Sequence, residues 1–323
     1  MNGLTTNLHL MMIPFYRPTP TRYRILIEKK SFPSDLYAVE SQIEMRGFDP
    51  KTALLELGPR ENEFTLRTED IVRTIEEQGD SIALVMFSGV QYYTGQYFEM
   101  QKITKAARQK GCRVGWDLAH AVGNVPVQLH AWDVDFAVWC SYKYLNSGPG
   151  GIAGAFLHKR HHGEKLQRLG GWWSQNWATR FDMNQPFDPI PDAYGFRLSN
   201  PPILQIAALR ASLDIFDAAT MPALREKSEL LTGYLQLLLQ RSFDIGTLEI
   251  ITPSDHKQRG CQLSVFWKID LTKAVELLEQ HGVICDVRKP NVTRLAPAPM
   301  YNSFMDVWRL VQILEIVVDE ITK

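Results

Sequence analysis

Four short apolar runs, separated by segments with helical spacing, constrain the fold of this chain more than any other feature. The runs cover residues 81–88, 112–117, 135–141 and 151–157. Between the first two, residues 94–110 have a helix-compatible pattern that ends at a Lys-Gly pair. Strands that are apolar along their whole length are buried on both faces, as in a parallel sheet covered by helices on each side. The sequence therefore predicts an α/β fold, in which ligands bind at the carboxyl ends of the strands.

A pair of prolines marks the predicted end of this first unit. Asn200-Pro201-Pro202 suits a loop followed by the first turn of a helix. We therefore expect a large domain at 1–200 and a smaller C-terminal domain at 201–323, entered by a linking helix. The elements expected in the second domain are helices at 203–218, 221–240, 271–281 and 303–322 and strands at 247–252, 262–267 and 283–286. This order predicts an α+β layout.

Composition excludes several classes of protein. The chain has 35 Lys and Arg against 36 Asp and Glu, which argues against a dedicated nucleic-acid binder. It has no apolar run of the roughly 18 residues that a membrane span needs, and no secretory signal is expected from its first residues. The four cysteines show no CxxC spacing, so we expect no zinc site and no disulfide framework. The doublet His161-His162 is predicted to lie in a solvated, charged loop and not in a metal site. A reduced, cytoplasmic protein is the expectation.

A lysine between an apolar strand and a glycine-rich turn is the most distinctive chemical feature. Lys143 lies in the sequence SYKYLNSGPGG. An exposed loop position is the commoner situation for a lysine. At the end of a strand and beside glycine-rich backbone, however, an amine can be partly desolvated and therefore nucleophilic. Such an amine forms Schiff bases with aldehydes, notably pyridoxal phosphate.

A pyridoxal site also needs an acid, an aromatic ring and donors for the phosphate. Asp117, in WDLAHAVG, ends a strand, and a carboxylate facing the pyridine nitrogen keeps the ring an electron sink. Capping of the turn before Ala119 is the alternative role for Asp117. Phe32, in FPSD, is the aromatic candidate, although a Phe before a Pro is usually a packing residue. The candidate phosphate ligands are hydroxyls and amides at Leu4, Thr5, Ser88 and Tyr142.

Five segments together resemble the kynureninase family of pyridoxal-phosphate enzymes, which have the aspartate aminotransferase type of fold. They are WDLAHAVGN, CSYKYLNSGPGGIAGAF, FPSD, GFRLSNPPIL and APAPMYNSF. The resemblance implies that Lys143 carries the cofactor covalently and that Asp117 binds its ring nitrogen, with His120 beside the ring. It implies that Phe32 stacks on the ring and that Asp35 helps to hold it. The residues that would serve the cofactor and its phosphate are Leu4, Thr5, Ser88 and Tyr142.

The same resemblance assigns three residues outside this cluster. Trp172 and Asn200 would complete the site, with Trp172 reaching across the interface of a homodimer and Asn200 also contacting the substrate. Arg294 would clamp the α-carboxylate of the substrate, which its planar fork can bind through two hydrogen bonds. Taken alone, a tryptophan is more often a packing residue and an arginine a surface cation.

The activity that the resemblance implies is hydrolysis of the Cβ–Cγ bond of L-kynurenine or 3-hydroxy-L-kynurenine. The products are anthranilate or 3-hydroxyanthranilate and L-alanine, in tryptophan catabolism and NAD biosynthesis. Tyr142 is expected to act as a proton donor, because its hydroxyl lies next to the lysine in sequence.

Two alternatives remain open. The first is another enzyme of the same fold, such as a cysteine desulfurase or a class V aminotransferase. A desulfurase needs a mobile cysteine in a glycine- or serine-rich loop, and none of the four cysteines lies in one. The second is a catalytically inactive, truncated subunit that keeps the fold. Members of the family carry a further N-terminal segment with dimer contacts and a substrate-contacting histidine, and this chain begins almost at the Gly3-Leu4-Thr5 loop.

Overall fold

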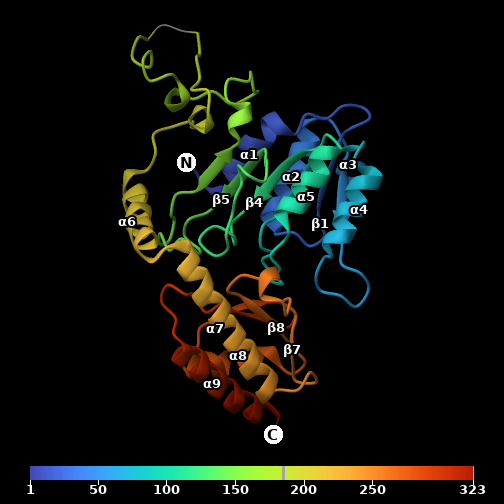
Figure 1. The fold of residues 1–323 in the computed structure, drawn as a ribbon, viewed down its shortest axis with the longest axis vertical. Helices are drawn as coiled ribbons and strands as arrows, with labels where there is room; N and C mark the ends of the chain where they lie inside the picture. Colours follow the sequence, from blue (N-terminus) through green and yellow to red (C-terminus); the bar gives the residue numbers. More distant parts are fainter. Residues whose placement is uncertain (184–185, 323) are drawn as a thin grey trace.

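The computed structural model describes residues 1–183 and 186–322. The α-helices are α1 Leu4–Phe15, α2 Pro33–Met45, α3 Pro50–Ala53, α4 Thr68–Gln78, α5 Met100–Gln109, α6 Ile203–Ala219, α7 Met221–Ser242, α8 Leu271–Gln280 and α9 Phe304–Thr322. The strands are β1 Arg24–Glu28, β2 Leu54–Leu57, β3 Ile82–Ser88, β4 Arg113–Asp117, β5 Phe136–Trp139, β6 Gly154–Leu157, β7 Leu248–Ile250, β8 Leu263–Trp267, β9 Asp286–Arg288 and β10 Val292–Leu295. Figure 1 shows a larger α/β unit, coloured blue to green, and a smaller unit at the C-terminus.

Six strands form the larger sheet in the order β2-β1-β3-β4-β5-β6. The four pairings among β2, β1, β3, β4 and β5 are parallel, and β6 at the edge runs antiparallel to β5. The prediction of a mostly parallel sheet is therefore confirmed. Parallel strands end at the same edge of a sheet, so Glu28, Ser88 and Asp117, the last residues of β1, β3 and β4, meet there.

Alternate side chains of the strands divide between two cores, one on each face of the larger sheet. Val85 and Phe87 of β3 pack with Trp116 in the core on the side of α4 and α5. Leu84 and Met86 of the same strand pack in the core on the side of α1 and α2. Successive strand residues point to opposite faces, so a strand that is apolar throughout needs a helical layer on both sides. Each of these buried side chains contributes about 1.5–3 kcal/mol of transfer free energy.

The smaller sheet has four strands in the order β7-β8-β10-β9, all paired antiparallel. Side chains from α7, α8 and α9 pack against it and form a separate core that includes Leu235, Leu278, Leu314 and Trp267. Figure 1 shows α6 standing apart from both sheets and leading into α7. This arrangement agrees with the predicted smaller α+β unit. The division of the chain at residues 200 and 201 into two domains stays a prediction.

The helix predicted at 94–110 is too long at its start, because α5 covers Met100–Gln109. The preceding residues form a loop at the carboxyl end of β3. There, Gln91 Oε1 accepts hydrogen bonds from two backbone N–H groups, and the side-chain amide of Gln96 pairs with both backbone groups of Leu66. Side chains thus provide the hydrogen-bond partners that a helix would otherwise supply.

The strand predicted at 283–286 is misplaced. The backbone N–H of Val283 bonds back to the carbonyl of Leu278, so Val283 completes the exit from α8. Ile284 is 92% exposed, and the strand β9 covers Asp286–Arg288. The apolar residues of this segment suggested a buried strand, but the sequence alone did not show that Ile284 lies at the surface. The strand β10, which was not predicted, pairs with β9 and carries one of the candidate site residues.

The prediction of a solvated loop around the histidine doublet is wrong for His161. Its side chain is buried, with Nε2 2.8 Å from Asp135 Oδ1 and Nδ1 3.0 Å from Glu164 Oε2. Arg160 Nη2 also donates to Asp135 Oδ1, at 2.6 Å. Buried polar groups need such partners. Asp135 precedes β5, so this ionic cluster lies at the amino edge of the sheet and away from the edge where ligands are expected.

Within the described part of the chain, no helix combines the length and the apolarity that a membrane crossing requires.

Candidate active site

Three acidic residues are buried at the carboxyl edge of the larger sheet. Glu28 ends β1, Asp117 ends β4, and Asp35 lies in the first turn of α2. Asp117 Oδ1 accepts the N–H of Ala119 at 2.6 Å, so this carboxylate also caps the following turn. The capping role that the sequence left open for Asp117 is therefore present and does not exclude a second role for its other oxygen.

Asp35 and Asp117 form a coupled pair. Burial raises the pKa of Asp117, and burial together with the negative charge of Asp117 raises the pKa of Asp35 well above its usual range. Both carboxyl groups are buried, so a cation such as a protonated ring nitrogen would suit this pair.

Glu28 holds Ser88 in place. Ser88 Oγ donates to Glu28 Oε1 at 2.5 Å across the paired strands β1 and β3. Burial raises the pKa of Glu28 to about 7. The hydroxyl of Ser88 is thus oriented by a residue that sequence reasoning missed, because the strand 24–28 was not among the predicted elements.

Lys143 reaches the same edge from the loop that follows β5. Ser141 Oγ closes this loop, lying 2.6 Å from Ser147 Oγ and 2.6 Å from the carbonyl oxygen of Ile152. Lys143 Nζ lies 5.8 Å from the centroid of the Phe32 ring. One hollow of about 20 Å³ brings together six predicted site residues, which are Phe32, Asp35, Ser88, Asp117, His120 and Lys143. The amine and the carboxyl group of Asp117, which are 26 positions apart in the sequence, therefore line one hollow with Asp35.

The first turns of α1 and α2 lie side by side near this hollow. Thr5 Oγ1 and Ser34 Oγ, one from each helix, are 2.8 Å apart. Helix N-termini carry free backbone N–H groups and a partial positive charge, which suit a phosphate. Leu4 and Thr5 belong to one of these turns, as the sequence predicted. Ser34 was not predicted as a site residue. The sequence feature that could have indicated it is its position directly after Pro33, in the first turn of α2.

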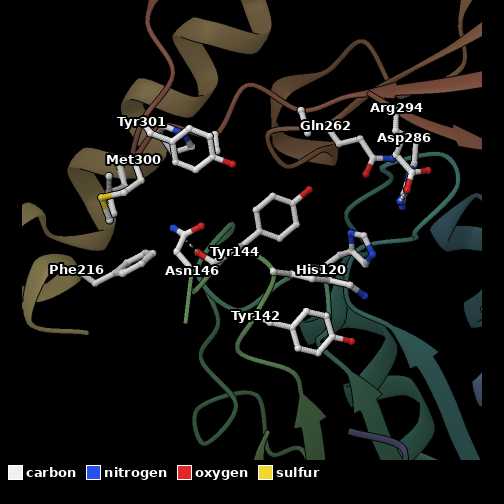
Figure 2. A pocket seen from close by; sticks show the side chains of 16 residues that line it. His120, Tyr142, Tyr144, Asn146, Phe216, Gln262, Asp286, Arg294, Met300 and Tyr301 are labelled. Atoms are coloured by element: carbon white, nitrogen blue, oxygen red, sulfur yellow. Dashed lines mark hydrogen bonds and ion pairs between the residues drawn. The ribbon is translucent and has the colours of Figure 1, made fainter. Parts of the chain in front are cut away.

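A larger cavity of about 350 Å³ adjoins the hollow and shares His120 and Lys143 with it. Figure 2 shows its two sides. His120, Tyr142 and Tyr144 come from the loops that follow β4 and β5 of the larger sheet, and Arg294 and Asp286 come from strands of the smaller one. A cavity of this size lies in the usual range for small-molecule sites. The structure therefore places Arg294, which is distant in sequence, in the same cleft as the lysine.

Burial shifts the pKa of two groups in this cleft. It raises the pKa of Tyr142 to about 12, so the hydroxyl, which is protonated at neutral pH as in an ordinary tyrosine, is a weaker acid than usual. Burial, and next the charge of Lys143, lower the pKa of His120 well below its usual range, so its imidazole is neutral.

Two buried polar atoms at the hollow fit a group that the chain itself does not supply. Asp35 Oδ1 and His120 Nδ1 have no hydrogen-bond partner among the residues that the structure describes. Buried polar atoms without partners are costly, and such atoms call for an explanation. A bound pyridoxal group would provide one, and the amine, the acids and the two helix N-termini are the donor set that this cofactor needs. The hollow alone has room for about one water molecule, so the ring would also need space from the adjoining cavity.

The smaller sheet is fastened to the loop that follows β3. The acceptors are the backbone carbonyl oxygens of residues 92–94. The hydrogen bonds are Gln262 Nε2 to Tyr92 at 3.2 Å, Arg294 Nη1 to Tyr92 at 2.9 Å, Ser264 Oγ to Tyr93 at 2.5 Å and Thr252 Oγ1 to Thr94 at 2.5 Å. These contacts fix the position of Arg294 relative to the carboxyl edge of the larger sheet.

Two predicted site residues lie elsewhere in this single chain. Trp172 and Asn200 are not among the described residues that line the hollow or the cleft. Trp172 Nε1 donates to the carbonyl of Arg180 at 3.3 Å, its ring packs on Phe181, and 47% of its surface is exposed. Figure 1 shows the yellow-green segment that contains Trp172 extending away from the larger sheet. Asn200 is exposed in the loop before α6.

Comparisons with known proteins identify relatives along the whole chain. Residues 224–314 match a family described as "Kynureninase C-terminal domain". The kynureninase of Nematostella vectensis is 54% identical, and the match covers 100% of this chain and 72% of that protein. The kynureninase of Myxococcus xanthus is 56% identical, with 98% of this chain and 74% of the relative covered. The human kynureninase is 52% identical, with 99% and 70% covered.

Solved structures share the fold at low sequence identity. A cysteine desulfurase from Thermococcus onnurineus superposes with a TM-score of 0.79 at 16% identity, covering 99% of this chain and 78% of that one. A mutant of a C–S lyase, solved with glycine linked covalently to its pyridoxal-phosphate cofactor, gives a TM-score of 0.81 at 17% identity, with 97% and 79% covered. These similarities show the fold. The reaction has to be inferred from the residues of the site.

Proposed function

The chain belongs to the kynureninase family, and on that premise we propose that its cleft binds pyridoxal 5'-phosphate and hydrolyses L-kynurenine and 3-hydroxy-L-kynurenine. The products are anthranilate or 3-hydroxyanthranilate and L-alanine. One observation carries this proposal. Lys143, Asp117 and Phe32 line one hollow, and the cleft that adjoins it contains Arg294.

Each of the cofactor's parts has candidate partners on this chain. Lys143 supplies the amine for covalent attachment, Phe32 the stacking face, and the Asp35–Asp117 pair the negative charge for the ring nitrogen. The first turns of α1 and α2, with Thr5 and Ser34, serve the phosphate. When bound, the cofactor supplies an aldehyde that condenses with amines and a ring that withdraws electrons from the substrate.

The chain's own residues then orient the substrate and move protons. Arg294 binds the α-carboxylate, which points the rest of the amino acid across the cleft toward Lys143. The amine of Lys143 is a base that can take the α-proton. The hydroxyl of Tyr142, which is protonated at neutral pH, donates a proton to the carbon that becomes the methyl group of alanine. Neutral His120, which lines the hollow, adds no charge that would oppose a protonated pyridine nitrogen.

The direct test is incubation of the purified chain with pyridoxal phosphate and L-kynurenine, followed by anthranilate fluorescence. We expect anthranilate release and a visible absorption band of the bound cofactor. Lys143→Ala is expected to lose both. Lys165→Ala, which removes an exposed lysine of another loop, is the matched control and is expected to keep both. A cofactor band without anthranilate release would refute the proposed activity. The chain would then be the catalytically inactive subunit, an alternative that the comparisons do not support.

We also propose that the working form is a homodimer. Exposed apolar side chains gather on the segment with Trp172 and on the first turns of α6, where Leu204 is 86% exposed. A second copy that covers these surfaces would bury them and would bring Trp172 toward a neighbouring cleft. This placement would account for a predicted site residue that lies away from the site of its own chain.

For location in the cell we propose the cytoplasm, which the four free cysteines support. Cell fractionation with detection of this chain is the measurement, and recovery in a membrane or secreted fraction would contradict it.

A further inference from the structure

Arg294 is held by a carboxylate of its own chain. Arg294 on β10 and Asp286 on β9 are directly opposite each other in the antiparallel pair. Arg294 Nε donates to Asp286 Oδ1 at 3.0 Å, and Arg294 Nη2 lies 2.7 Å from Asp286 Oδ2. The carboxylate therefore contacts one side of the guanidinium, and Figure 2 shows both side chains projecting from the smaller sheet into the cleft.

A second arginine anchors this carboxylate. Arg288 Nη2 donates to Asp286 Oδ2 at 3.0 Å, and Arg288 Nε lies 2.9 Å from Oδ1. Arg288 and Asp286 are two positions apart on β9 and thus on the same face of the strand. The guanidinium of Arg288 also lies 5.8 Å from the centre of the Tyr92 ring. The three side chains carry a net charge of one positive unit, which leaves room for a further carboxylate.

The contacts of Arg294 leave two of its donors free to bind that carboxylate. A guanidinium has one N–H on Nε and two on each terminal nitrogen. Asp286 faces Nε and one side of Nη2, and the carbonyl oxygen of Tyr92 accepts from Nη1 at 2.9 Å. One N–H therefore remains on Nη1 and one on Nη2, and the two oxygens of a carboxylate can accept them.

We propose that Asp286, anchored by Arg288, is a positioning residue that fixes Arg294 so that Nη1 and Nη2 receive the α-carboxylate of the substrate. This inference rests on the proposed function. Arginine has a long side chain that loses much rotational freedom when it is ordered. A fork that is held in advance does not pay this entropy when the substrate binds, so Asp286 improves substrate affinity without touching the substrate.

The test is steady-state kinetics of Asp286→Asn in the cofactor-loaded protein. We expect KM for L-kynurenine to rise about tenfold while kcat changes less than twofold. The reason is that the enzyme–substrate complex and the transition state would lose the same stabilising interaction. Glu279→Gln, which neutralises an exposed acid of α8, is the matched control and is expected to leave both constants unchanged. Arg288→Gln is expected to raise KM in the same direction by releasing Asp286.

A double-mutant cycle separates positioning from a general structural effect. Arg294→Lys keeps the charge but removes the fork. In that background, Asp286→Asn is expected to raise KM no further, because the residue acts through the guanidinium. An equal loss in both backgrounds would overturn the proposal. So would a lower KM in Asp286→Asn, which would make Asp286 a competitor for Arg294, and so would an unchanged KM.

Failure of the proposed function is distinguishable from failure of this inference. If the wild-type chain releases no anthranilate, the proposed function fails, and the same comparison is made by calorimetry with L-alanine as the carboxylate probe. A roughly tenfold weaker affinity for Asp286→Asn supports the positioning role. Equal affinities of the wild type and the variant, or the lack of any alanine binding, overturn it.

Discussion

Glu28 offers a quantitative link between a buried charge and stability. Its carboxyl lies beneath Ser88, and burial raises its pKa from 4.5 to about 7. The folded protein therefore binds this proton more tightly than the unfolded chain does. The stabilisation from the protonated form is complete below about pH 4.5 and is lost as the pH rises through about 7. At about 1.36 kcal/mol per pH unit of difference, the loss between about pH 5 and pH 8 is about 2.5 kcal/mol.

The variant Glu28→Gln removes this titration and keeps an oxygen that can accept the hydroxyl of Ser88. Relative to the wild type, we expect the free energy of unfolding of the variant to improve by about 2–3 kcal/mol between pH 5 and pH 8. Groups that do not interact with Glu28 titrate alike in both proteins, so their contributions cancel in this difference, whereas Asp35 and Asp117 also respond to the loss of its charge.

The assay is urea unfolding at the two pH values without added cofactor, followed by tryptophan fluorescence. Glu56→Gln on the neighbouring strand β2 is the control, because its carboxylate is exposed. We expect that control to follow the wild type at both pH values. If Glu28→Gln and the wild type change in parallel between pH 5 and pH 8, the reasoning about the buried carboxyl is refuted.

Three further changes test other parts of the structure. Tyr142→Phe is expected to lower kcat by about 100-fold while the absorption band of the bound cofactor persists, because only the proton donor is lost; an unchanged kcat would contradict the role. Gly115→Ala places a methyl group against the ring of Phe136 in the larger sheet and is expected to cost about 1–3 kcal/mol in urea unfolding; a neutral result would mean that the ring can move. Leu204→Glu is expected to shift a dimer toward monomers in light scattering with an unchanged circular dichroism spectrum, and a variant that stays dimeric would rule out this surface of α6.

The sequence predicts the centre of the larger sheet because burial on both faces leaves a strong pattern. β3 and β4 are continuous apolar runs, and each ends in the polar residue that the site uses, Ser88 or Asp117. β1 ends in Glu28 and is equally buried, but it was not recognised beforehand. The pattern is weaker in the smaller sheet. There, Ile284 is apolar and exposed, whereas the short strand β10 alternates in polarity.

The candidate site was predictable where one segment holds several of its groups. The segments around Lys143 and Asp117 each supply an unusual residue with a local reason for its role. Ser34 and Glu28 were missed because each acts through a partner that is remote in sequence. Asp286 was missed because its partner Arg294 faces it from β10, a strand that was not predicted. The hydrogen bonds between Ser34 and Thr5, from Ser88 to Glu28 and from Arg294 to Asp286 form only when the chain is folded.

The hydrogen bonds that join the two units tolerate mutation differently at their two ends. The acceptors at residues 92–94 are main-chain oxygens, which each of the twenty amino acids possesses. A substitution at these three positions therefore leaves the four acceptors in place. The donors are side chains of Thr252, Gln262, Ser264 and Arg294, so a substitution of any of these can remove a hydrogen bond between the two units.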